Sequence, residues 1–195
     1  MPCRDHATPV LRSGARVALA LAVCLIAPGA VVAGGAQADQ ILRPQAAVTE
    51  ILRVDRVIRL ELELPVEPEV AYDAWTDASQ LVEWLPHWAE MTVAEDSGFE
   101  MGWEGYDGVW TGTYLEVDRP EALAFTWLPP ESVFPAGSYE TEVRIRFEPR
   151  EEGGTLLLLE HSGFRDTPEM EAQLQAWRPY LFALRAFLLQ MPASG

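Results

Sequence analysis

The chain has 195 residues, and 30 acidic against 14 basic side chains give it a formal net charge of −16 at pH 7. The basic side chains are all arginines, since the sequence contains no lysine. A surface this acidic repels phosphate backbones and anionic lipid headgroups, which argues against nucleic acid as a partner.

The first segment predicts a secretory signal peptide over residues 1–38. Arginines precede an apolar run, Val17–Ala27, which is shorter than the roughly 20 residues that a membrane-spanning helix needs. The small residues of Ala36-Gln37-Ala38 then offer a site for signal peptidase. We therefore expect cleavage after Ala38 and export to the periplasm or the exterior. The alternative is an uncleaved anchor that extends through Val32.

Cleavage would remove both cysteines, because Cys3 and Cys24 lie within the predicted leader. The exported domain would then have no disulfide, no thiol nucleophile and no thiolate metal site. Its length suits a single domain that is stable on packing alone and makes no contact with the membrane after cleavage.

The next predicted elements are a flexible N-terminal arm, residues 39–52, and a domain over residues 53–191. Within residues 60–64 leucine alternates with glutamate, the pattern of a half-buried strand. Pro68 opens a short helix, and a capping pattern predicts a second one from Ala78 to about Trp84.

A series of strands separated by turn residues is predicted to follow. These strands cover residues 99–103, 109–117, 122–127, 143–147 and 155–162. Residues 129–137 form a longer loop, because prolines cannot donate to a central ladder, and residues 151–154 form a hairpin turn.

The last predicted element is a long helix, capped by Thr167 and with Pro168 at its first position. Apolar residues recur along it at three- and four-residue steps: Leu174, Trp177, Leu181, Leu184 and Leu188. Pro179 is predicted to kink or interrupt this helix, since proline removes a backbone donor.

This order of elements predicts an α+β fold with two short helices after the first strand. A sheet with one apolar face needs a cover, and the C-terminal helix is the one predicted element long enough to provide it. We expect a curved antiparallel sheet wrapped around that helix, with a pocket between the two.

Four segments carry a family resemblance. They are residues 68–77 with Leu81 and Trp84, residues 112–127, residues 154–164, and Trp177, Leu181 and Leu184 in the closing helix. In this order they resemble the START-like SRPBCC superfamily, in the branch named for the activator of the ninety-kilodalton heat-shock chaperone's ATPase. The resemblance implies a helix-grip fold with a cavity between sheet and helix. It implies no single activity, because the superfamily includes lipid carriers, hormone receptors and aromatic cyclases.

Residues typical of catalysis are sparse. His87 and His161 are the histidines beyond the predicted leader, and no H-x-x-x-H pattern, phosphate loop or nucleophile elbow occurs. We therefore assign no metal, no cofactor and no catalytic residue. His161 has the side-chain parity of Leu157 and Leu159, so it is either a lone polar group in a pocket or, as we favour, a histidine bonded to a neighbour without a functional role.

The seven tryptophans are the most informative feature, and all follow the predicted leader. Ordinary core packing explains each one singly, yet together they favour an apolar pocket. Trp84 and Trp88 are expected at its rim. The residues predicted to line the cavity are Trp84, Trp88, Met101, Trp103, Trp110, Tyr114, Phe125, Trp127, His161, Trp177, Leu181 and Leu184.

These features favour a non-enzymatic module that binds a hydrophobic or aromatic small molecule. One alternative is an enzyme of the cyclase or dehydratase type that uses the same pocket, which a buried His161 paired with a carboxylate would favour. The other alternative is a chaperone-cofactor-like module that contacts a protein partner.

Overall fold

The computed structural model describes residues 49–50, 56–133 and 137–191. The predicted leader and nearly all of the predicted arm lie outside these residues, so both stay predictions. No helix in the described part of the chain is long and apolar enough to cross a membrane.

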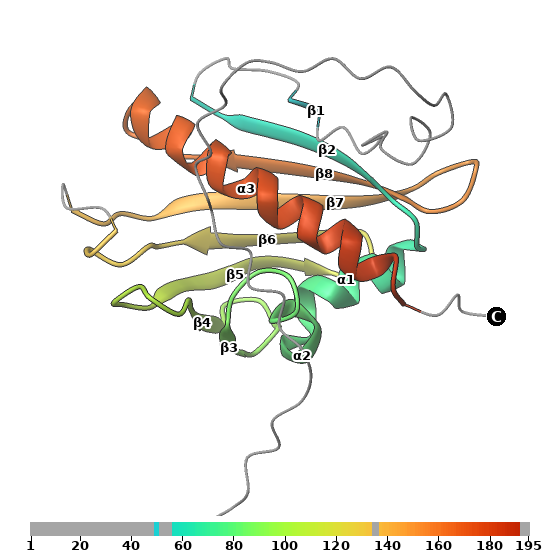
Figure 1. The fold of residues 1–195 in the computed structure, drawn as a ribbon, viewed down its shortest axis with the longest axis horizontal. Helices are drawn as coiled ribbons and strands as arrows, with labels where there is room; N and C mark the ends of the chain where they lie inside the picture. Colours follow the sequence, from blue (N-terminus) through green and yellow to red (C-terminus); the bar gives the residue numbers. More distant parts are fainter. Residues whose placement is uncertain (1–48, 51–55, 134–136, 192–195) are drawn as a thin grey trace, which may run out of the picture. The chain divides into compact units, whose positions relative to one another are not determined.

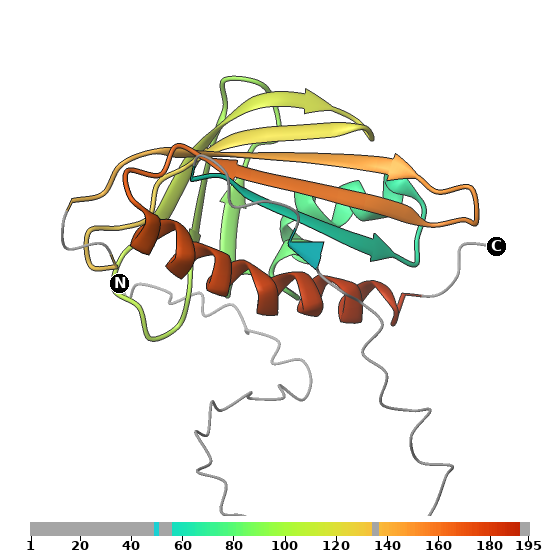
Figure 2. The ribbon, with the colours of Figure 1, turned by 90° about the horizontal axis from the view of Figure 1, so that it is seen from above.

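Eight described strands form one antiparallel sheet in the order β1-β2-β8-β7-β6-β5-β4-β3. They are β1 Thr49–Glu50, β2 Ile58–Leu64, β3 Trp88–Met91, β4 Gly98–Gly102, β5 Trp110–Asp118, β6 Ala122–Trp127, β7 Thr141–Pro149 and β8 Thr155–Ser162. The long helix α3 lies across one face of this sheet (Figure 1), and the sheet curves over it (Figure 2). The helix-grip fold expected from the sequence is confirmed.

The alternating pattern of β2 places leucines on one face of the sheet and charged side chains on the other. Leu60 and Leu62 are buried on the face that α3 covers, while Arg59 and Glu61 are half-buried on the opposite face. Leu62 pairs across the ladder with Leu157 of β8, so two leucine-rich strands build the centre of the covered face.

The two short helices follow β2 as predicted. They are α1, Pro68–Thr76, and α2, Ala78–Leu81, the second of which ends before the predicted Trp84. The Asp77 side chain caps α2 by accepting a 2.8 Å bond from a backbone N–H two residues on. The Trp84 indole donates a 2.9 Å bond to the Ala74 carbonyl and so holds the segment after α2 against α1.

The long helix α3 spans Thr167–Leu188. Its N-cap is Asp166, whose side chain accepts a 2.9 Å bond from the backbone of Glu169, and not Thr167 as the sequence suggested. Pro179 lies inside the helix, which continues through it to Leu188, so the predicted interruption is wrong, while the alternative of a kink stays a prediction. Proline removes one backbone hydrogen bond, whereas the buried stripe on both sides of it keeps the helix packed against the sheet.

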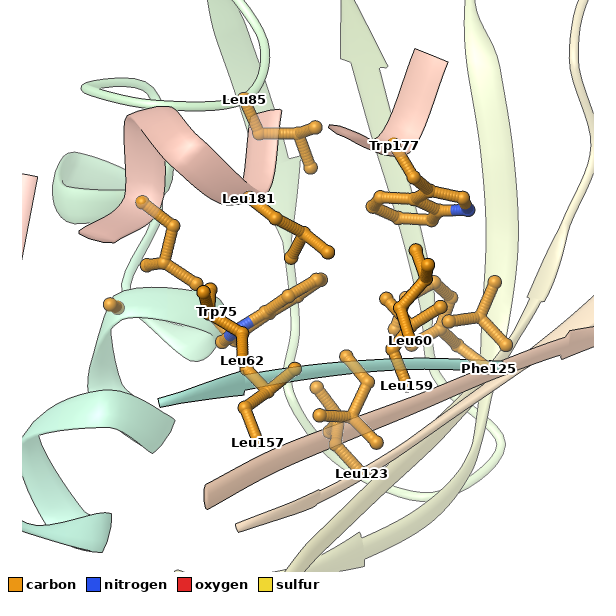
Figure 3. Close-up of a cluster of buried hydrophobic side chains, with 14 of the residues drawn as sticks. Leu60, Leu62, Trp75, Leu85, Leu123, Phe125, Leu157, Leu159, Trp177 and Leu181 are labelled. Atoms are coloured by element: carbon orange, nitrogen blue, oxygen red, sulfur yellow. The ribbon is translucent and has the colours of Figure 1, made fainter. Parts of the chain in front are cut away.

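The core lies between α3 and the sheet. Trp177 and Leu181 point from α3 toward the leucines of β2 and β8 (Figure 3). Leu62, Leu157 and Leu181 are each fully buried. Burying a leucine side chain stabilises a fold by about 1.5–3 kcal/mol, so this layer anchors the helix to the sheet.

Candidate ligand pocket

A pocket of about 190 Å³ lies between α3 and the end of the sheet where β4 ends, β5 begins and β6 ends. Residues from α3, from β5 and β6, from the segment after α2 and from two loops line it: Leu85, Trp103, Tyr106, Trp110, Trp127, Val133, Ala172, Gln173, Ala176, Trp177 and Tyr180. Two larger hollows, of about 420 and 350 Å³, lie along the strands and are lined by several charged side chains. The aromatic hollow is therefore the candidate site for an apolar ligand.

The walls of the pocket are aromatic rings in mutual contact. The rings of Trp103 and Trp110 have centroids 4.4 Å apart at an interplanar angle of 66°, and the Tyr180 ring lies 6.1 Å from Trp103. On the side of α3, the rings of Trp127 and Trp177 lie 5.9 Å apart. Edge-to-face and tilted pairs of this kind stabilise one another beyond the area they bury, so the wall is continuous.

Hydrogen bonds fix two of these indoles. The Trp103 Nε1 donates a 2.8 Å bond to the Leu85 carbonyl, and the Trp177 Nε1 donates a 3.0 Å bond to Nδ1 of His161. A tryptophan anchored at its N–H cannot turn freely about its side-chain torsions. The pocket shape is therefore set before any ligand arrives.

His161 is the centre of a buried hydrogen-bond chain. Because the Trp177 indole can only donate, Nδ1 of His161 accepts, and its Nε2 carries the proton that it donates over 2.7 Å to the Thr141 hydroxyl. Thr141 in turn donates over 3.1 Å to the Trp127 carbonyl. Burial lowers the pKa of His161 from its usual 6.5 to about 3. The ring is therefore neutral at physiological pH, and it links two tryptophans of the pocket.

Two loops meet at the mouth of the pocket. Tyr106 comes from the β4–β5 loop and is 62% exposed, and Val133 comes from the loop that follows β6. The Ser132 hydroxyl donates to the Asp107 carbonyl, and a Cβ added at Gly108, whose φ is +116°, would lie 2.5 Å from Pro130. Only glycine fits this close approach, so the two loops are held against each other beside the opening.

Comparison with known proteins connects this geometry to a family. Residues 65–188 match the family described as "Activator of Hsp90 ATPase homolog 1-like protein". The chain belongs to this family. None of the curated proteins compared with the chain matches it significantly.

Solved structures share the fold of this Hsp90-ATPase-activator-like domain. The protein MLL2253 from Mesorhizobium loti superposes with a TM-score of 0.63 at 23% identity, covering 70% of this chain and 98% of its own. The protein described as the Aha1 dimer from Colwellia psychrerythraea has a TM-score of 0.57 at 20% identity, covering 68% and 95%. CalU16 from Micromonospora echinospora has a TM-score of 0.57 at 21% identity, covering 69% and 76%. These likenesses establish the fold.

Four of the residues expected in the cavity line the pocket: Trp103, Trp110, Trp127 and Trp177. Six others are buried in the core outside its lining: Trp84, Met101, Tyr114, Phe125, Leu181 and Leu184. Trp84 is thus not at a rim. Trp88 is 40% exposed, and its indole covers the backbone of Gly102, where an added Cβ would lie 2.3 Å from its Nε1.

His161 lies behind the pocket rather than in its lining. Of the two positions weighed from the sequence, the observed one is a histidine bonded to its neighbours, here Thr141 and Trp177. Its side chain is fully buried and reaches the pocket through the Trp177 indole.

The sequence reasoning missed several lining residues. Gln173, Ala176 and Tyr180 lie on α3 at three- and four-residue steps and flank Trp177, so helical periodicity could have found them. Tyr106 and Val133 come from loops, where no periodic pattern indicates which way a side chain faces.

The described residues contain no group of three histidine, cysteine, aspartate or glutamate side chains that could hold a metal ion. What the lining offers instead is ring surface, the Gln173 amide and the hydroxyl groups of Tyr106 and Tyr180. This arrangement can bind and orient an apolar molecule.

Proposed function

We propose that this chain is an exported START-like domain that binds a hydrophobic or aromatic small molecule in the pocket between its sheet and α3. The observation that carries the proposal is the lining itself. Six of its side chains are aromatic, and none of the described residues in it is charged. A hollow with such walls favours a ligand that leaves water to contact rings and aliphatic groups.

The rigidity of the walls supports binding of a ligand by a preformed site. The anchored indoles of Trp103 and Trp177 need not be ordered when the ligand enters. Side chains that are already fixed lose little conformational entropy on binding, which leaves more of the contact energy as affinity.

The enzyme alternative lacks the feature it requires. A cyclase or dehydratase of the expected kind would pair a buried His161 with a carboxylate, whereas Thr141 and Trp177 occupy both ring nitrogens. One solved relative is described as the Aha1 dimer, and the family is described as similar to an activator of the Hsp90 ATPase. A role in contacting a protein partner remains the alternative, and export as proposed from residues 1–38 would separate the domain from a cytosolic chaperone.

Native mass spectrometry of the chain purified gently from its own host tests the binding function. We expect a reproducible extra mass that is lost on denaturation. Ala176→Phe should abolish it, because Ala176 lines the pocket and a phenyl group would fill much of the space. Ala186→Phe is the matched control on an exposed position of the same helix and should keep the bound mass. A bound mass that A176F retains would place the ligand elsewhere.

The proposed export has its own test. Sequencing the N-terminus of the protein recovered from its host should give a chain that starts at Asp39 in the periplasmic or secreted fraction. A chain that retains residues 1–38 in the cytosol would contradict the proposal and favour the protein-partner alternative.

A further inference from the structure

We propose that the ligand is an uncharged aromatic molecule of one or two fused rings that carries an oxygen acceptor, such as a phenol or an aromatic ketone. This inference rests on the proposed function, since it names the chemical class of molecule for the same pocket. Size, shape, charge and hydrogen bonding of the lining each restrict the class.

The volume of the pocket sets the size. An apolar cavity of about 150 Å³ binds a single benzene ring. The pocket here is about 190 Å³, which admits one ring with substituents or two fused rings. A long acyl chain or an extended polycyclic system would leave much of its apolar surface in water.

The walls favour a flat ring over a flexible chain. The rings of Trp103, Trp110, Trp127 and Trp177 are fixed by their contacts with one another. A planar aromatic can make offset or edge contacts with several of these rings, and it loses little internal freedom on binding. An aliphatic chain of equal volume would gain none of the ring contacts and would lose the freedom of its torsions.

The charge of the site disfavours anions. None of the described residues that line the pocket is charged, so an ion of either sign would lack a countercharge there, and the net charge of −16 of the whole chain further disfavours an anion. A bound aromatic carboxylate would have no countercharge inside the pocket, and desolvating an unpaired charge is costly. Acidic aromatics are therefore expected to bind much more weakly than their neutral counterparts.

The hydrogen-bond donors of the lining favour a ligand that carries a hydrogen-bond acceptor. The polar side chains of the lining are those of Tyr106, Gln173 and Tyr180. Burial raises the pKa of Tyr180, which keeps its hydroxyl protonated and able to donate. Gln173 supplies the side-chain amide of the lining. A bound ligand would displace water from these groups, and an oxygen acceptor on the ligand would replace the hydrogen bonds that their donors lose.

Binding of four matched probes to the full chain, measured by isothermal titration calorimetry, tests the inference. The probes are 2-naphthol, naphthalene, 2-naphthoate and 1-decanol, with (2-naphthyl)trimethylammonium as a cationic comparison. We expect 2-naphthol to bind at least tenfold more tightly than each of the other four. Tyr180→Phe or Gln173→Leu should bring the affinity for 2-naphthol close to that for naphthalene, while Ala186→Phe should leave the tenfold ratio unchanged.

The outcomes distinguish an error in the proposed function from an error in the proposed ligand class. If none of the probes binds and Ala176→Phe changes nothing in the native mass spectrum, the proposed function itself is wrong. If 1-decanol, 2-naphthoate or the cation binds as tightly as 2-naphthol, and Ala176→Phe abolishes that binding, the pocket is correct and the ligand class is wrong. Equal affinity for 2-naphthol and naphthalene would refute the need for an oxygen acceptor.

Discussion

Acidification should destabilise this protein through His161. The ring is fully buried, and burial lowers the pKa of His161 in the folded state to about 3, whereas an unfolded chain gives histidine its usual value of 6.5. The unfolded state therefore binds a proton first as the pH falls. The contribution of the neutral ring is fully present above pH 6.5 and is lost progressively as the pH falls from 6.5 to about 3.

The loss of stability follows from the difference between the folded and unfolded pKa values of His161. Within the window between the two pKa values the free energy of unfolding should fall by about 1.4 kcal/mol for each pH unit. From pH 7.5 to pH 5 the loss attributable to His161 is about 2 kcal/mol, and below the lower pKa it reaches about 5 kcal/mol. The geometry agrees in direction, because a proton on Nδ1 would displace the Trp177 indole that donates to that atom.

Urea unfolding across this pH range, compared between the natural chain and His161→Gln, measures the effect. Carboxylates titrate equally in both proteins, so their contribution cancels in the difference between the two curves. We expect that difference to shrink by about 2 kcal/mol between pH 7.5 and pH 5, since glutamine does not titrate. His87→Gln controls for the loss of a histidine at an exposed position. Parallel curves for the natural chain and H161Q would refute the reasoning.

Two further substitution pairs test the packing. Leu181→Asp should lower the free energy of unfolding by more than about 4 kcal/mol or prevent folding, because it places a charge in the fully buried helix–sheet layer. Gln175→Ala, at an exposed position of α3, should change that free energy by less than about 0.5 kcal/mol. Equal thermal stability of the two variants would contradict the assigned helix face. Gly154→Ala should destabilise more than Gly153→Ala in chemical denaturation, because both glycines have positive φ but only the added Cβ at Gly154 would meet the Leu64 carbonyl oxygen, at 2.4 Å. Equal losses would show that backbone strain alone, without the close approach, sets the cost.

Local patterns determined the elements of this fold. Alternation of leucine with glutamate over residues 60–64 predicted β2, and the glycine pair at 153–154 predicted the turn before β8. The spacing of apolar residues predicted α3 and the side that it buries. These signals are readable because a strand repeats every two residues and a helix every 3.6, so each element shows its buried face in its own sequence.

Other local features were predicted wrongly from the sequence. Thr167 was the predicted N-cap of α3, whereas Asp166 is the residue whose side chain accepts the capping hydrogen bond. Pro179 is a strong break signal on its own, yet α3 continues through it. The strand β3, Trp88–Met91, was not predicted, because its own sequence does not indicate a strand. It forms by pairing with β4.

The position of the pocket was decided by tertiary structure. The periodicity of a strand or a helix tells which face a tryptophan occupies, but it does not tell how far along the sheet the ring lies. Trp84 and Trp103 are therefore equal candidates in sequence, whereas the fold buries Trp84 against α1 and brings Trp103 to the lining, together with Tyr106 of the β4–β5 loop and Tyr180 of α3. Contacts between segments far apart in the chain define a cavity, and no local periodicity encodes such contacts.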